Sequence, residues 1–222
     1  PTSNPNFASL PANVRAMYSM PLGNRLEAYG FGLNGSVDLG GVTLKSITGY
    51  RFSDTDGVVD TDGTPAPILT TWAGYSSKQW SQELQINGGV GEKFTYIAGG
   101  YFSDEKGQEF SRSQNFGFLP YSATTRPYAG LAGQTLADVH NRSVGVFGQG
   151  YYQLTEAVRL AGGLRWTWDD RDTKLYNYST WGVATTCNLP NPDVAGVCAQ
   201  TQKTSFDYPA WTFGIDWQVN DD

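Results

Sequence analysis

The fold is decided by residues 42–52, which read VTLKSITGYRF. The even-numbered positions, from Val42 to Phe52, are mainly apolar or aromatic, and they would lie on one face of an extended chain. The odd-numbered positions, which include Lys45 and Arg51, would lie on the opposite face. Because the side chains of a β-strand point alternately to its two faces, this pattern predicts a strand with one apolar and one polar surface.

The same alternation returns along most of the chain. It predicts an all-β protein with about seven strands: 26–37, 42–52, 79–87, 93–103, 143–154, 158–168 and 211–219. Short turns are predicted at 38–41, 89–92 and 155–157, and long polar loops at about 57–77, 104–140 and 172–203. A regular alternation of short and long connections is typical of an antiparallel transmembrane barrel, with short periplasmic turns and long extracellular loops.

The composition is compatible with such a barrel. The 222 residues include 27 Gly, 13 Tyr, 11 Phe and 7 Trp, which favours strands and tight turns. The mean hydropathy is only −0.40, but a barrel strand needs no more than every second residue to be apolar. No apolar run reaches the roughly 18 residues that a membrane-spanning helix needs. A net charge of −6 without a basic stripe argues against nucleic-acid binding.

Aromatic residues gather at the ends of the predicted strands. If the short turns are periplasmic, one set marks the outer ends: Tyr50, Phe52, Trp80, Trp166, Trp168 and Trp211. A second set marks the inner ends: Phe94, Tyr96, Tyr152 and Trp217. Two such girdles are expected where amphipathic rings meet the two interfaces of a membrane. The alternative is a soluble β-sandwich with aromatic residues in its core, which would not need them sorted to strand ends.

Two groups of residues are candidates for binding. Charged residues on the polar face would line the lumen of a barrel and contact a plug or a solute: Lys45, Arg51, Glu83, Arg165 and Asp216. Aromatic residues in the predicted loops would either stack on a ligand or pack one loop against another, and both alternatives stay open: Trp72, Tyr75, Tyr121, Tyr128 and Trp181.

Cys187 and Cys198 frame a short polar segment, CNLPNPDVAGVC. This spacing is no zinc pattern, because two further ligands would have to lie nearby. We expect a local disulfide, which implies an oxidising compartment, and two unpaired thiols are the alternative.

Other motifs give weak indications of chemistry. GFGLNG at 30–35 matches a dinucleotide fingerprint but precedes no helix, so glycine packing along a strand is preferred. DTDG occurs at 54–57 and 60–63, but without the distal glutamate of a calcium loop it indicates a solvated acidic loop. His140 is the only histidine, and nothing pairs it with a nucleophile or places Glu83 beside Asp216. We therefore expect no enzyme, no metal site and no cofactor.

Five stretches resemble barrel strands of TonB-dependent receptors, in that family's order. They are LKSITGYR at 44–51 with its acidic DTDG loop, WSQELQI at 80–86, YIAGGYFSDE at 96–105, VFGQGYYQLTEAVRLAGGLRWTWDDRD at 146–172 and WTFGIDWQVNDD at 211–222. The fourth ends in a Gly-Leu-Arg-aromatic-Thr signature that is similar to the family's. The resemblance covers residues 42–222 except for the long loops.

The resemblance implies that residues 1–222 are part of a receptor barrel domain, without its plug domain, its TonB box and its last strands. Because the chain starts at Pro1, with no initiating Met and no signal peptide, we expect that further sequence precedes it. Seven strands with two open edges would not be stable alone in lipid.

The function implied by the resemblance is energised uptake across the outer membrane of a Gram-negative bacterium. The family's substrates are ferric siderophores, cobalamin, haem and oligosaccharides, and the expected partners are the TonB–ExbB–ExbD complex, the nutrient, and outer-membrane lipid with lipopolysaccharide. Two alternatives are a passive porin-type channel and a surface adhesin or phage-receptor barrel. The presence of a plug would distinguish the receptor from the channel.

Overall fold

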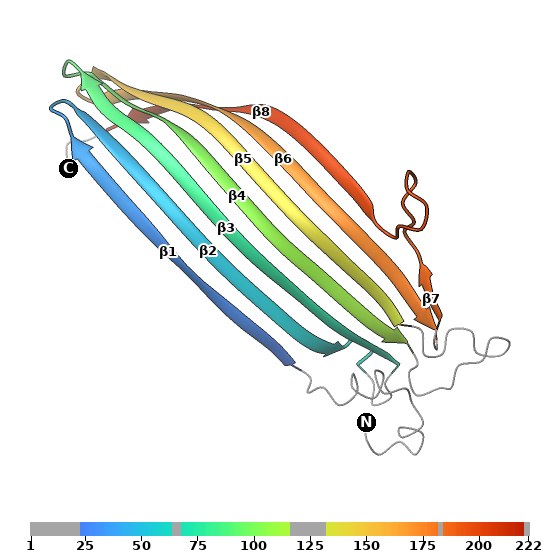
Figure 1. Cartoon of the computed structure of the whole chain (residues 1–222). Coiled ribbons are helices and arrows are strands. Elements are labelled where there is room, and N and C mark those ends of the chain that lie inside the picture. The colour runs from blue at the N-terminus through green and yellow to red at the C-terminus, as the bar shows by residue number, and fades with distance from the viewer. Residues whose placement is uncertain (1–22, 64–67, 116–131, 182–183, 220–222) are drawn as a thin grey trace.

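The computed structural model describes residues 23–63, 68–115, 132–181 and 184–219. The strands of this part form one sheet (Figure 1): β1 (Gly23–Asp38), β2 (Val42–Asp60), β3 (Leu69–Val90), β4 (Phe94–Asn115), β5 (Ala132–Thr155), β6 (Val158–Trp181), β7 (Ala184–Cys187) and β8 (Gln200–Trp217). All neighbours are antiparallel, and both the short β7 and the long β8 pair with β6. The seven long strands confirm the predicted antiparallel barrel segment. Among the described residues there is no helix that could cross a membrane.

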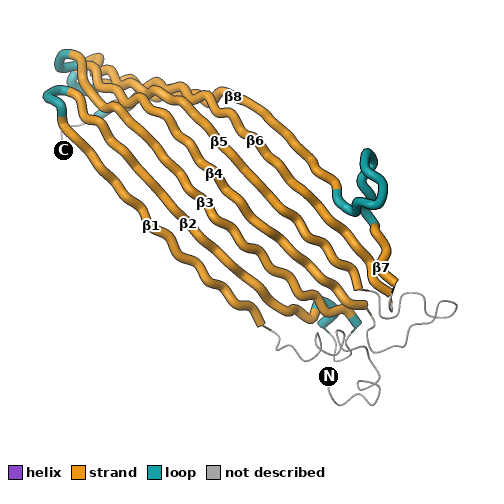
Figure 2. Tube along the Cα trace, in the orientation of Figure 1, coloured by secondary structure: helices purple, strands orange, loops and turns teal. Residues whose placement is uncertain are grey.

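Three short turns lie together at one end of the sheet (Figure 2), where they join β1 to β2, β3 to β4 and β5 to β6. They overlap the predicted turns and confirm them. Gly40, Gly41 and Gly91 have φ angles of 79°, 104° and 61°, which residues with a Cβ rarely adopt. In the first turn, the amide of Gly40 also donates to the side chain of Asp38 at 2.8 Å. Glycine is therefore required here by the backbone.

The strands run much farther than predicted on the side away from these turns. β2 continues to Asp60 instead of ending near residue 52, and β5 begins at Ala132 instead of near residue 143. The loops predicted at 57–77, 104–140 and 172–203 therefore contain long pieces of strand, and this prediction was wrong. Its physical cause is that both faces of these strand ends are mainly polar, with only isolated apolar residues such as Trp72 and Phe110. The backbone ladder continues there without any hydrophobic alternation that would reveal it.

The two faces of the sheet differ in chemistry. Leu44 of β2 lies opposite Val37 of β1 and Ile86 of β3, and this apolar set continues across all long strands on one face, here called the outward face. Its large side chains are exposed, for example Leu164 at 57% and Trp211 at 78%. The buried apolar residues of the described part are few and mostly small: Val58, Ala132, Ala137 and Ala199. A soluble sandwich would bury its apolar face, so this sheet requires another apolar environment.

The outer aromatic set marks the end of the apolar band, but the strands continue beyond it. Its members all lie on the outward face: Tyr50, Phe52, Trp80, Trp166, Trp168 and Trp211. Their predicted place at strand ends was wrong, because the strands continue beyond them as polar extensions. The inner set lies on the same face, near the short turns: Phe94, Tyr96, Tyr152 and Trp217. From its border to the short turns, the apolar band runs over 42–52 in β2 and 94–102 in β4, close to the roughly 9 to 11 residues that cross a membrane when tilted.

The border of the apolar band that lies away from the short turns runs obliquely to the strand register. Phe52, the last residue of the continuous apolar band in β2, lies opposite the charged Lys78 of β3. At three strand pairs, β2–β3, β3–β4 and β6–β8, the border moves two residues toward the short turns relative to the paired positions. It therefore moves by six residues in all between Tyr29 in β1 and Pro209 in β8. This slip is about 20 Å along the strands over roughly 29 Å across six strand spacings, a tilt of about 35°. Tilts of this size are typical of membrane barrels.

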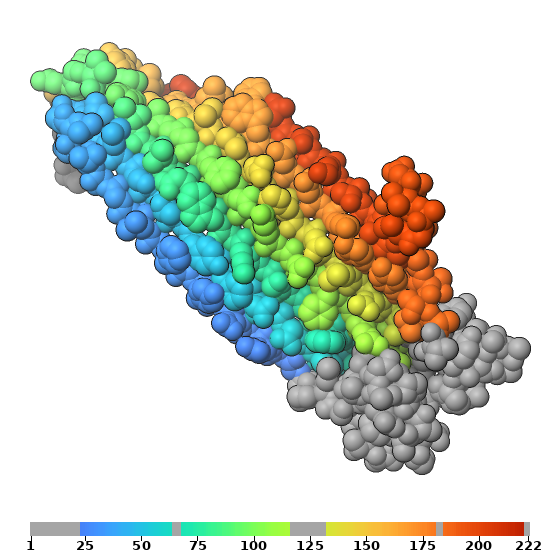
Figure 3. Space-filling view, in the orientation of Figure 1, coloured from blue at the N-terminus to red at the C-terminus, as the bar shows by residue number. Residues whose placement is uncertain are grey.

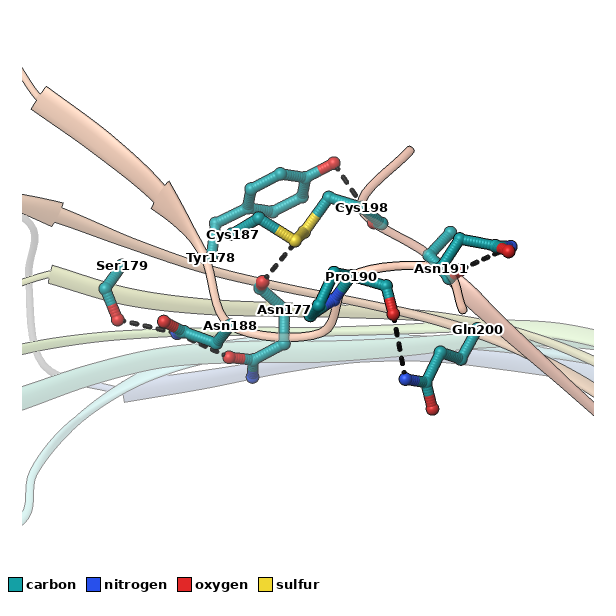
Figure 4. Close-up of a disulfide and its surroundings, with 10 residues drawn as sticks. Asn177, Tyr178, Ser179, Cys187, Asn188, Pro190, Asn191, Cys198 and Gln200 are labelled. Atoms are coloured by element: carbon teal, nitrogen blue, oxygen red, sulfur yellow. Dashed lines mark hydrogen bonds between the residues drawn. A yellow bond between two sulfur atoms is a disulfide. The ribbon is translucent and has the colours of Figure 1, made fainter. Parts of the chain in front are cut away.

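The predicted disulfide between Cys187 and Cys198 is present and closes the projecting loop between β7 and β8 (Figures 1 and 4). Asn188 fastens the loop to β6, because its side-chain nitrogen donates to Asn177 Oδ1 and Ser179 Oγ, both at 2.7 Å. The loop also folds on itself. The side-chain oxygen of Asn191 accepts bonds from two backbone amides, at 2.8 and 3.0 Å. Figure 3 shows this loop standing out from the curved surface of the strands.

The assignment of faces predicts opposite responses from two neighbouring residues of β3. Leu84, which is 58% exposed on the outward face, should not tolerate arginine, and Leu84→Arg is expected to destabilise the lipid-embedded protein by about 2–4 kcal/mol. Gln85→Arg places the same charge on the opposite face and should cost under about 0.5 kcal/mol. Chemical unfolding of the complete, closed barrel in lipid vesicles measures both, and equal costs would contradict the assignment.

Replacing Cys187 and Cys198 by serine should loosen the loop without unfolding the sheet. Closing so short a loop constrains its unfolded state by about 3 kcal/mol in the chain-entropy model, and this contribution acts locally here. We expect faster protease cleavage within 188–197 and unchanged thermal unfolding of the strands. Limited proteolysis with mass spectrometry detects the cleavage, and the reduced wild type is the control. Unchanged cleavage in the double variant would show that the hydrogen bonds alone hold the loop.

Candidate functional site

The candidate site lies on the face opposite the apolar band, here called the polar face. The register places all five predicted lumen residues on it: Lys45, Arg51, Glu83, Arg165 and Asp216. A barrel closes around one face of its sheet, and the apolar face of this sheet suits lipid. The polar face is therefore the one that would surround a lumen. Contact of these residues with a plug or a solute stays a prediction.

Asp216 is engaged by an arginine that the sequence did not single out. Arg159, directly opposite it on β6, donates from Nε and Nη2 to the same carboxylate oxygen, at 2.9 and 2.7 Å. The guanidinium of Arg159 also lies 5.1 Å from the ring centre of Tyr151. Because both partners are about half exposed, this ion pair is worth at most about 1 kcal/mol. Its effect is to hold a charged pair at a fixed place near the turn end of the polar face.

Arg165 lies flat against the sheet. Its guanidinium is 5.3 Å from the ring centre of Tyr101, and its Nε donates to Thr167 Oγ1 at 3.0 Å. Gly145 makes this position possible, since a Cβ there would come within 2.9 Å of the guanidinium. Neither terminal nitrogen of Arg165 has a hydrogen-bond acceptor among the described residues. An oriented arginine with free donors is suited to bind a carboxylate or another anion.

Glu83 and Arg165 border the same hollow on the polar face. The hollow has a volume of about 400 Å³ and is also lined by Phe147, Gln149 and Thr212. Gln85 donates to one carboxylate oxygen of Glu83, which orients that side chain. The structure thus brings together two of the five predicted residues around one concave surface. It does not bring Glu83 to Asp216, because β4, β5 and β6 separate their strands, so no pair of catalytic acids forms.

Farther from the turns, the polar face carries a network that sequence analysis missed. Glu105 accepts hydrogen bonds from Ser77 at 2.9 Å and from Tyr75 and Asn141 at 3.2 Å. Partial burial raises the pKa of the Glu105 carboxyl, but these three donors outweigh burial and hold it below its ordinary value. The network lies beyond the band, where the sequence predicted loops. No alternation marks it, so no sequence signal could have found it.

Asp169 extends this network on β6. Its side chain is only 8% exposed, and Oδ2 lies 3.8 Å from Arg171 and 3.5 Å from the hydroxyl of Tyr208. The other oxygen, Oδ1, has no hydrogen-bond partner in the described part of the chain. A buried acceptor of this kind is suited to a donor from a bound group. By contrast, Lys45 and Arg51 form no ion pair with any described residue and are exposed.

The predicted loop aromatics are mostly not in loops. Trp72 and Tyr75 belong to β3, and they point to opposite faces because they are three residues apart in one strand. Trp72 packs edge-on against Phe110 at 4.9 Å, which is contact between strands, whereas Tyr75 donates to Glu105. Trp181 is the last residue of β6. Tyr121 and Tyr128 lie outside the described residues.

The weaker motifs acquire structural explanations. Residues 30–35 lie within the strand β1, which agrees with the prediction that their glycines pack along a strand. The acidic stretch at 54–57 belongs to β2, so the prediction of a loop was wrong there. Within the described residues, no group of three or more acidic, histidine or cysteine side chains could hold a metal ion. His140 lies on the outward face, with Nε2 2.6 Å from Asp104, and not beside a nucleophile.

Comparison with known proteins now identifies the family. The crystal structure of the ferric yersiniabactin uptake receptor FyuA from Yersinia pestis is similar, with a TM-score of 0.66 at 13% identity. The match covers 90% of this chain and 27% of the receptor chain. No curated protein matches the sequence significantly. The family model described as the β-barrel of TonB-dependent receptors matches residues 2–222, and the chain therefore belongs to that family.

Proposed function

We propose that this chain forms part of the barrel wall of a receptor that imports a scarce nutrient across the outer membrane of a Gram-negative bacterium. The observation that carries the proposal is one sheet with a lipid-compatible band on its outward face and anchored charges on its polar face. Membership of the TonB-dependent receptor family supports energy coupling through TonB, with ExbB and ExbD as its partners.

The two edge strands support a larger barrel. Within the described part of the chain, β1 and β8 each pair with only one neighbour, which leaves a row of backbone groups without strand partners there at either edge. Unpaired backbone groups are costly in lipid, so further strands have to close the sheet. The chain spans about a quarter of the receptor that it matches. We therefore regard residues 1–222 as a portion of the barrel domain, whose plug and remaining strands are supplied by other parts of the receptor.

On the polar face, Arg165 and the hollow that it shares with Glu83 are the best candidates for contact with the plug or the passing solute. Arg165 is held in place by Tyr101 and Thr167, so little side-chain entropy is lost when an anion binds its free nitrogens. Glu83 offers a charge of opposite sign at the same hollow. A surface with both signs recognises a polar partner better than a uniformly charged wall does.

A ferric siderophore is the substrate that we favour, because the similar solved structure is described as a ferric siderophore uptake receptor. Cobalamin, haem and oligosaccharides are the alternatives within the proposed function. A passive porin-type channel would show uptake that is independent of TonB and of the proton gradient. A surface adhesin or phage receptor would show cell or phage binding without uptake.

Replacing Arg165 by alanine in the complete receptor should lower uptake or weaken retention of the plug. Removing one charge-assisted hydrogen bond costs about 1.4 kcal/mol or more, so we expect at least about a tenfold loss. Initial uptake of a radiolabelled ferric siderophore by whole cells measures transport, and protease resistance of the plug measures retention. Arg112→Ala, on the outward face of β4, is the matched control.

The same cells test the energy source. Uptake should stop when TonB is deleted or when a protonophore collapses the proton gradient. Uptake that continues in both cases would support the porin instead. Uptake and plug retention at the wild-type level in the Arg165→Ala variant would show that Arg165 does not belong to the proposed contact surface. That result would not contradict the proposed receptor function.

A further inference from the structure

The network around Glu105 fixes the direction of its hydrogen bonds. An ionised carboxylate only accepts, so the hydroxyl groups of Ser77 and Tyr75 and the side-chain nitrogen of Asn141 all donate to it. Oε1 of Glu105 receives both hydroxyl groups, whereas Oε2 receives only Asn141 and keeps a further lone pair. Because their donors are used in this way, Tyr75 and Asn141 present oxygen lone pairs to a group that approaches them.

Asp169 adds an unsatisfied acceptor beside this network. Its direct partner in β5 is Ser143, so Asn141 is its diagonal neighbour, at a distance of about 7–8 Å that side chains can bridge. The side chain of Asp169 is only 8% exposed, and its Oδ1 has no hydrogen-bond partner within the described residues. A buried carboxylate in this state lacks a donor. Arg171, which lies 3.8 Å from Oδ2, is 44% exposed and can move aside to admit one.

The charges on this part of the polar face are mainly negative. From β3 to β8, the described strand residues of this face beyond the aromatic border include three carboxylates, Glu105, Glu109 and Asp169, but one cation, Arg171. Arg51 lies in the same cross-strand row as Glu105 but two strands away, in β2. The surface therefore has an excess of both acceptors and negative charge.

A primary ammonium group matches this surface better than a neutral hydroxyl group or a guanidinium does. A charged donor forms hydrogen bonds roughly twice as strong as those of a neutral donor. An ammonium is compact and has three donors, which equals the number of acceptors at the network: Glu105 Oε2, the hydroxyl of Tyr75 and the side-chain oxygen of Asn141. The surface is thus the reverse of the one around Arg165, whose free donors suit an anion.

We infer that the polar face around Glu105 binds a primary ammonium group of the imported solute. The inference rests on the proposed function, and it narrows the favoured substrate to ferric chelates that carry a free cationic amine. Tyr75 and Asn141 contact the ammonium through their oxygens, and Glu105 and Asp169 balance its charge. Glu105 then determines the charge specificity of the wall, on the side of Arg165 that lies away from the short turns.

The test compares two ferric chelates that differ in this one group. Ferric desferrioxamine B carries a free primary ammonium, and its N-acetyl derivative lacks that charge. Each chelate is titrated into the complete receptor in detergent, and calorimetry gives its dissociation constant. The wild type should bind the cationic chelate at least about tenfold more tightly, because hydrogen bonds between charged partners are lost on acetylation.

Three variants assign the preference to the network. Glu105→Gln removes the charge, so it should bind the two chelates equally, within about twofold. Tyr75→Phe removes one acceptor, and it should weaken binding of the cationic chelate about threefold without affecting the acetylated one. The matched control is Glu92→Gln, in the turn between β3 and β4, which should bind as the wild type does. Resistance to unfolding by dodecyl sulfate before heating shows that each variant is folded.

Three results would overturn the inference: equal binding of the two chelates by the wild type, no binding of the cationic chelate, or an unchanged preference in Glu105→Gln. Calorimetry requires neither TonB nor a proton gradient. Its failure would therefore leave TonB-dependent uptake untouched, whereas uptake that is independent of TonB would contradict the proposed function and not the measured preference.

Discussion

The structure depends on one constraint, which is that backbone N–H and C=O groups must be paired wherever water is absent. A continuous antiparallel ladder meets this constraint from β1 to β8. The side chains are then free to differ on the two faces, because the backbone ladder joins the strands without a packed apolar core between them. This explains why a sheet with few buried apolar residues can be regular over strands of 16 to 24 residues.

The membrane then determines where the outward face changes from apolar to polar. On the outward face, the apolar band ends obliquely to the register because the strands are tilted, so Phe52 and Trp80 belong to one border although they are not opposite each other. Beyond that border both faces are mainly polar, with isolated apolar contacts such as that of Trp72 with Phe110. The polar face instead carries charged and polar groups along its whole length, from the Arg159–Asp216 pair near the turns to the network of Glu105. The outward band and the polar face thus form a lipid-contacting surface and a surface suited to contact a solute.

Sequence analysis could predict the part of the fold that the membrane imposes. Within 42–52 one face must be apolar, so alternation revealed the strand, and the same holds for the five lumen charges placed on the polar face. Strand extensions such as 53–60 carry no such requirement and were taken for loops. Contacts such as Arg165 with Tyr101, or Arg159 with Asp216, depend on cross-strand register, which no single stretch of sequence contains.

The central claim is that one face of each strand contacts lipid up to the aromatic border and water beyond it. Nitroxide labels placed one at a time along β6, in the complete receptor in lipid bilayers, test this by their collision rates with oxygen and with a water-soluble nickel complex. From 158 to 168, we predict that oxygen contact alternates with a period of two and peaks at even positions such as Leu164. At Asp170 and Asp172 the nickel complex should dominate. Alternation that continues past Trp168, or nickel contact at Leu164 equal to that at Gly163, would contradict the account.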